Sequence, residues 1–343
     1  MMALKIHLTY KFPPSILNLH KSNFLSNKQE YVLSQGRAIP TVFAAKKDST
    51  EKGETMMTGK LIDLYEKCAH ESMDRRQFLR NVSVLAGSTA AVAALLPLLE
   101  GSRAQAQTTA KDAPSLVTEY LNYKGATGDV RAYFARQNRS DKQPAVLVIH
   151  ENRGLVPHIE DVTRRIAAEG FLAFAPDALT PLGGTPKDFE KEGPALIAKL
   201  DGPATLQNYL AAVKFLKSHP KSTGKVGVVG FCWGGAMANQ LAVNSPDVSA
   251  VVPYYGRQPA SEDVPKIKAP LLLHYAAIDE GINKGIAAYD AALKKAGAEY
   301  TMYLYEGAQH AFNNDTNLPR YNREAAQLAW QRTIAFFKLK LRK

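Results

Sequence analysis

The sequence predicts a fold of the α/β class, with helices flanking both faces of a doubly wound, mostly parallel sheet. From residue 116 onward, apolar runs of strand length alternate with segments of helical spacing, which is typical of such sheets. Residues 145–150, AVLVIH, form an apolar run, as expected for a strand that is buried on both faces. The chain has 343 residues, of which 45% are hydrophobic, and this is enough for a sizeable core.

The expected elements follow one another in a regular order. Residues 116–123 and 130–135 alternate like strands, and Gly125-Ala126-Thr127-Gly128 between them predicts a hairpin turn. The helix expected at residues 158–169 ends at Gly170, a typical stop signal. Further strands are expected at 171–175, 225–230, 249–254, 270–275 and 300–305, further helices at 203–219, 236–243, 282–296 and 322–341, and a loop rich in Gly and Pro at 178–194.

Residues 107–343 are expected to form one domain, preceded by an export signal at residues 73–106. This segment contains RRQFLR, an 18-residue stretch without charge at residues 82–99, and Ala104-Gln105-Ala106 as a cleavage site. The RRQFLR hexapeptide resembles the twin-arginine motif, which the twin-arginine export machinery reads on folded cargo. We therefore expect a periplasmic protein; the alternative is a protein anchored by its signal, with no other membrane contact.

Residues 1–72 are an N-terminal extension that is expected to be disordered or to reflect a mis-assigned start codon. Residues 1–47 contain seven Lys or Arg and one acidic residue, a bias that an organellar transit peptide would also show. Translation starting at Met57 or at Met73 would also give a protein that begins with an export signal. Little stable structure is expected before residue 113, apart from helix near residues 61–67 and through the signal.

The charge of the chain does not predict a nucleic-acid partner. Lys and Arg number 43 against 32 Asp and Glu, but the basic residues are scattered, with one short run at residues 338–343. A nucleic-acid binder usually gathers its basic residues on one stripe with interleaved aromatic side chains. Such a run of basic residues more often forms the solvent-exposed face of a helix.

The cysteines narrow the possible functions. There are two, and cleavage after Ala106 would remove Cys68 and leave Cys232 alone. A single cysteine in an exported protein cannot form an internal disulfide. Cys232 is then a buried inert thiol, an intermolecular link or a reactive nucleophile.

Cys232 lies in the sequence Gly230-Phe231-Cys232-Trp233-Gly234-Gly235, between a buried strand and a helix. Glycines on both sides permit a sharp turn that presents the central side chain above the sheet, as in a nucleophile elbow. The helix N-terminus that follows favours a thiolate. The alternative is a small buried residue in a Gly-rich turn.

Two further residues complete a candidate catalytic triad. Asp279 follows the strand expected at 270–275, and His310 follows the strand expected at 300–305. Taken alone, each is more often a turn or structural residue. However, the order Cys232, Asp279, His310, each just past a strand, is the order of α/β-hydrolases, and such strand ends meet at one edge of a parallel sheet.

These motifs, with HENRGL after the strand at 145–150 and GAQHAF around His310, resemble the dienelactone hydrolase family over residues 115–341. The resemblance implies an α/β-hydrolase fold and cleavage of a small-molecule ester or lactone, without a cofactor, through a thioester on Cys232. It also implies that Glu151 helps to deprotonate Cys232. The backbone N–H groups of Trp233 and Asn152 would form the oxyanion hole.

The sequence departs from the family where its members hold a substrate carboxylate. The family arginine four residues after the histidine is replaced by Asn314, and no Arg occurs between residues 166 and 256. Dienelactone itself is therefore not the expected substrate. Arg153 could contact a substrate anion, or it could form a salt bridge.

No metal or cofactor is expected. HENRGL lacks the second histidine of a His-Glu-x-x-His zinc site, and neither GxGxxG nor GxxxxGK[ST] occurs. Two other functions stay open from the sequence. One is a catalytically silent α/β-hydrolase that binds a ligand, and the other is a thiol redox protein that uses Cys232 without a CxxC partner.

Overall fold

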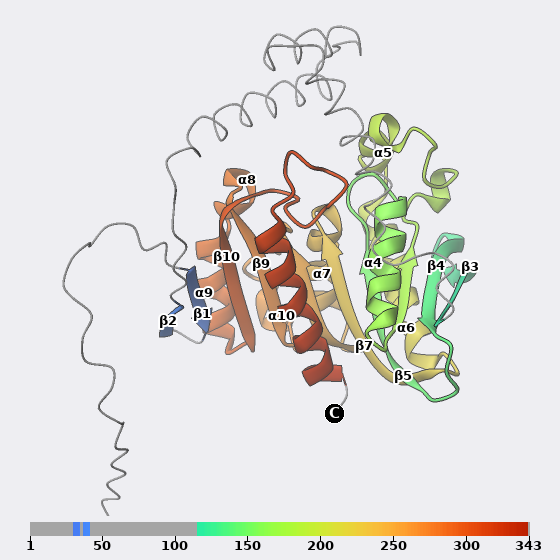
Figure 1. Cartoon of the computed structure of the whole chain (residues 1–343), viewed down its shortest axis with the longest axis horizontal. Coiled ribbons are helices and arrows are strands. Elements are labelled where there is room, and N and C mark those ends of the chain that lie inside the picture. Colours follow the sequence, from blue (N-terminus) through green and yellow to red (C-terminus); the bar gives the residue numbers. More distant parts are fainter. Residues whose placement is uncertain (1–29, 35–36, 42–114, 342–343) are drawn as a thin grey trace, which may run out of the picture.

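The computed structural model describes residues 30–34, 37–41 and 115–341, and its centre is one mixed sheet (Figure 1). The strand order is β2-β1-β10-β9-β8-β7-β5-β6-β4-β3. The six strands from β10 to β6 are parallel to one another, and the strands outside them, β1 and β2 on one side and β4 and β3 on the other, pair antiparallel. This arrangement confirms the predicted mostly parallel sheet.

Each predicted strand is present, with slightly different ends. The hairpin strands are β3 (Leu116–Gly125) and β4 (Gly128–Gln137), and all residues of β5 (Gln143–Ile149) are buried. Alternate β5 residues pack on opposite faces, Leu147 in one core cluster and Val148 in the other. The remaining strands are β6 (Leu172–Pro176), β7 (Ser222–Phe231), β8 (Val248–Tyr254), β9 (Leu271–Ile278) and β10 (Tyr300–Gln309).

Helices cover both faces of the sheet, as the doubly wound fold requires. Helices α4 (Pro157–Ala168) and α10 (Arg323–Leu341) pack on the face toward the viewer in Figure 1. Helices α6 (Gly202–Ser218), α7 (Trp233–Asn244) and α9 (Ile286–Ala296) pack on the opposite face. The two apolar clusters therefore lie on either side of one sheet, which leaves the carboxyl ends of the strands free to build a site.

Three local predictions were wrong. The expected loop at residues 178–194 contains a 3₁₀ turn (Thr180–Leu182) and the start of α5 (Phe189–Ile197), which has Pro194 inside it. The apolar Phe189 packs on the core and outweighs the helix-breaking composition. The single helix expected at residues 282–296 is two, α8 (Glu280–Asn283) and α9, with Gly285 between them.

The third difference concerns the N-terminal extension. The structure has the strands β1 (Glu30–Ser34) and β2 (Arg37–Thr41), and β1 pairs antiparallel with β10. Both strands contain β-branched or aromatic residues, and β10 would otherwise be an open sheet edge. The expected export signal at residues 73–106 and the helix near residues 61–67 lie outside the described residues. Within the described ranges, no helix is long and apolar enough to cross a membrane.

Candidate active site

Cys232 occupies a strained turn between β7 and α7. Its backbone angles are φ 55° and ψ −114°, a conformation that residues other than glycine rarely adopt. Such a conformation costs on the order of 1–3 kcal/mol and persists where the surroundings enforce it. Here the Cys232 N–H donates to the Tyr254 carbonyl at 3.1 Å, and its own carbonyl accepts from the Ala236 N–H at 3.1 Å. The predicted strand–turn–helix geometry at Cys232 is present.

Two glycines make this turn sterically possible. A Cβ on Gly230 would lie 2.0 Å from the Gly234 carbonyl oxygen. A Cβ on Gly234 would lie 2.4 Å from the carbonyl oxygens of Ile149 and His150. The start of α7 is thus pressed against the end of β5, so Cys232 lies next to the Glu151–Arg153 segment.

His310 and Asp279 meet at the same edge of the sheet, beyond the ends of β10 and β9. His310 Nδ1 lies 2.6 Å from Asp279 Oδ2, so Nδ1–H donates to the carboxylate and Nε2 is left for a reacting group. Burial of the ring favours its neutral form, but interactions with Asp279 and Cys232 outweigh this and raise the pKa of His310 to about 10. The structure therefore brings the three predicted triad residues together.

The two predicted oxyanion-hole groups are both available. Trp233 is the first residue of α7, so its N–H has no partner within the helix. Asn152 follows β5 in an irregular segment. Neither N–H donates a hydrogen bond to another group in the described part of the chain. Both are therefore free to bind a developing negative charge.

Glu151 is buried beside the nucleophile and is held by a residue that the sequence analysis noted only as a replacement. The Asn314 Nδ2–H donates to Glu151 Oε2 at 2.6 Å, and Glu151 is 4% exposed. The other oxygen, Oε1, is buried as well, and the Glu151 carboxylate also interacts with the hydroxyl of Tyr255. Asn314 thus fixes one oxygen of the Glu151 carboxylate.

Tyr255 is a site residue that the sequence analysis missed. Burial of its hydroxyl, together with interactions with Glu151 and Cys232, raises the pKa of Tyr255 well above its ordinary value. Its ring centroid is 5.0 Å from that of His310. Tyr255, Cys232 and Ala311 are the residues other than glycine with positive φ in the described ranges. All three follow strand ends at this edge, where strain is commonly stored.

Arg153 forms the ion pair that was one of its two expected roles. Its Nε lies 2.5 Å from Glu190 Oε2 of α5. Gly193 of the same helix packs on the Arg153 backbone, where a Cβ would lie 2.8 Å from Arg153 Cα. Glu190 thus partly neutralises the charge of Arg153. Helix α5 packs against the Glu151–Arg153 segment and holds it in place.

His150, the histidine of HENRGL, has a structural role. Its Nδ1–H donates to the Glu151 carbonyl at 2.6 Å, and its Nε2 accepts from the Ala178 N–H at 3.1 Å. Burial lowers the pKa of His150, and its ring stacks on Trp233. In the part of the chain that the structure describes, no group of three His, Cys, Asp or Glu side chains could hold a metal ion.

Comparison with known proteins identifies the family of this chain. The family model of the dienelactone hydrolase family matches residues 130–341. A Methylorubrum extorquens protein provisionally named carboxymethylenebutenolidase is 33% identical over 250 residues, which cover 68% of this chain and 85% of that protein. An Escherichia coli K12 protein with the same provisional name is 31% identical over 240 residues, covering 65% of this chain and 88% of that protein.

The fold is also shared with a solved structure. The crystal structure of a Klebsiella pneumoniae protein, provisionally named a dienelactone hydrolase, matches with a TM-score of 0.58 and 27% identity. The match covers 65% of this chain and 98% of that protein, so the shared part is nearly the whole of the relative.

Proposed function

Because this chain belongs to the dienelactone hydrolase family and is an ester or lactone hydrolase with the α/β-hydrolase fold, we propose that it acts through Cys232, His310 and Asp279. In this proposal Cys232 is the nucleophile, His310 transfers the proton, and Asp279 orients His310. The substrate is a small-molecule ester or lactone, and the covalent intermediate is a thioester.

The first half-reaction forms the thioester. Because its pKa is raised, His310 already holds the proton of the Cys232–His310 pair on Nε2, and the Cys232 sulfur attacks the carbonyl carbon of the substrate. The N–H groups of Trp233 and Asn152 bind the oxyanion, and each such donor contributes roughly 10²–10³ in rate. As the oxyanion collapses, the C–O bond to the leaving group breaks and the imidazolium returns the proton to the leaving alkoxide. Asp279 stabilises the imidazolium through its bond to Nδ1.

The second half-reaction releases the acid. His310 Nε2 takes a proton from water, the resulting hydroxide attacks the thioester carbonyl, and the C–S bond breaks. The proton then returns to the Cys232–His310 pair. The buried Glu151 carboxylate, held through Oε2 by Asn314, assists the deprotonation of Cys232 in the resting enzyme.

One observation carries this proposal: the 2.6 Å bond between His310 and Asp279, placed beside a cysteine held in a strained turn. A purely structural histidine would not need to interact with both a carboxylate and a cysteine at the strand ends.

Iodoacetamide treatment tests the proposal. We expect the full-length protein to hydrolyse activated esters such as p-nitrophenyl acetate, and iodoacetamide to abolish this activity in step with alkylation of Cys232. Peptide mapping by mass spectrometry separates Cys232 from Cys68. Full activity after complete alkylation of Cys232 would contradict the proposed nucleophile. An unreactive Cys232 without turnover would instead favour a ligand binder.

A further inference from the structure

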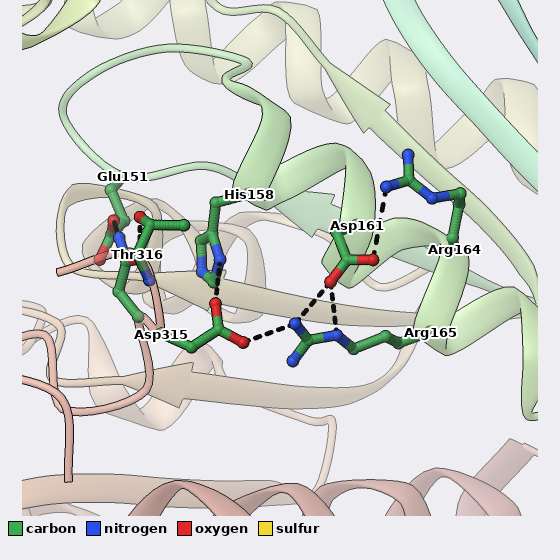
Figure 2. A network of polar contacts seen from close by, with 8 residues as sticks. Glu151, His158, Asp161, Arg164, Arg165, Asp315 and Thr316 are labelled. Carbon is green, nitrogen blue, oxygen red and sulfur yellow. Dashed lines mark hydrogen bonds and ion pairs between the residues drawn. The ribbon is translucent and has the colours of Figure 1, made fainter. Parts of the chain in front are cut away.

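A network of polar and charged side chains, buried or partly buried, connects α4 to the loop that carries His310 (Figure 2). We call residues 310–316, which contain His310 and Asn314, the His310 loop. Asp315 in this loop lies between two partners on α4: its Oδ1 is 3.0 Å from His158 Nδ1, and its Oδ2 is 2.6 Å from Arg165 Nη2. Burial alone would raise the pKa of Asp315, but His158 and Arg165 lower it below its usual range.

The partners of Asp315 are themselves fixed within α4. Arg165 Nε donates to Asp161 Oδ2 at 2.7 Å, and Arg164 Nη2 donates to Asp161 Oδ1 at 3.3 Å. The Asp161 and Arg164 side chains are fully buried. His158, Asp161 and Arg165 stand three and four residues apart, so they share one face of the helix. Asp315 therefore binds a rigid surface.

The residue before Asp315 reaches the nucleophile side of the site. The Asn314 side-chain oxygen accepts from both the N–H and the hydroxyl of Thr316, at 3.0 and 2.6 Å, which directs its NH₂ group to Glu151. Two consecutive residues of the His310 loop thus bind one continuous segment, Asn314 at Glu151 and Asp315 at the helix that follows it.

From this arrangement we propose that Asp315 is a positioning residue, which fixes the His310 loop against α4 and thereby sets the placement of His310 and Asn314 beside Cys232. The proposal rests on the proposed roles of Cys232 and His310. Asp315 itself does not touch the reacting atoms, and it acts through its neighbours in the loop.

Stability alone is a poor explanation for this network. Burying charged groups costs desolvation energy, and a buried ion pair often stabilises a fold no more than packed apolar residues would. Catalysis, in contrast to stability, requires that the loop carrying His310 keeps one fixed position. A displacement of about 1 Å in a catalytic group can cost about 100-fold in rate. The contacts of Asp315 with Arg165 and His158 meet this requirement because they define both direction and distance.

The test is Asp315→Asn in the full-length protein, with Glu169→Gln as the matched control. Glu169 caps the other end of α4 and pairs with Lys338 of α10 at 2.5 Å, so its neutralisation breaks a similar contact away from the loop. We expect Asp315→Asn to lower kcat for p-nitrophenyl acetate about 10–100-fold with little change in KM. Alkylation of Cys232 by iodoacetamide at pH 7 should also slow. Glu169→Gln should stay within about twofold on both measures.

Wild-type kcat and wild-type Cys232 alkylation in a folded Asp315→Asn protein would overturn the inference. If that variant does not fold, Arg165→Gln removes the same contact from the helix side and should give the same pattern; wild-type values there would equally overturn it. If neither variant folds, Asp315 is a folding determinant and the inference is wrong. A wild-type Cys232 that reacts slowly with iodoacetamide would instead count against the proposed nucleophile itself.

Discussion

Replacing Cys232 with alanine should abolish hydrolysis of activated esters. The substitution removes the atom that forms the thioester, and loss of a triad nucleophile typically costs at least about 10⁴-fold in kcat/KM. The measurement is steady-state hydrolysis of p-nitrophenyl acetate by purified full-length protein. Cys232→Ser is the matched variant, because it keeps the size of the side chain and changes only its chemistry.

The fold should survive this change. Cys232 is partly exposed, and its conformation is enforced by backbone contacts to Tyr254 and Ala236, which alanine retains. Circular dichroism and thermal unfolding should therefore match those of the wild type. A Cys232→Ala protein that turns over substrate at near-wild-type rates would remove the triad assignment altogether.

His310→Gln should cause the second large loss, about 10⁴-fold in kcat/KM. Glutamine fills part of the ring volume but cannot accept the Cys232 proton or activate water. Asp279 would keep a hydrogen-bond donor but lose the ring that it orients. A rate within tenfold of the wild type would show that another group carries the proton.

The same variant changes how stability depends on pH. The pKa of His310 is about 10 in the folded protein, against an ordinary value of 6.5. The stabilising contribution of the proton is therefore fully present below pH 6.5, and it declines as pH rises toward 10, at about 1.4 kcal/mol per pH unit. Urea unfolding of the wild type and of His310→Gln at several pH values in this range measures this decline in stability. The difference in unfolding free energy between wild type and His310→Gln should shrink with rising pH; a constant difference would contradict the raised pKa.

Much of this molecule could be predicted from its sequence because the informative signals are local. Continuous apolar runs such as residues 145–150 indicate buried strands, and the glycines around Cys232 indicate a sharp turn. Once the strands are assigned as parallel, the residues that follow them must gather at one edge. Cys232, Asp279 and His310 were found in this way, and the structure places them at that edge.

The contacts that tune the site were not predictable in the same way. Asn314 and Glu151 are 163 residues apart in sequence, and no local pattern pairs an amide with a carboxylate over such a distance. Asp315 and His158 are similarly remote. Tyr255 does carry a signal, since it follows a strand at the same edge in PYYG, but aromatic residues at strand ends are common. The helix α5 was missed because tertiary packing overrides the composition of its segment.

Trapping the acyl-enzyme shows whether Cys232 forms a thioester. Full-length protein is mixed with a slowly hydrolysed activated ester, quenched in acid within the first turnover, digested and analysed by mass spectrometry. We expect the mass of one acyl group on the peptide containing Cys232, its removal by hydroxylamine, and its absence from the Cys232→Ala protein. An acyl group on another residue, or turnover in which Cys232 never carries one, would contradict the thioester on Cys232.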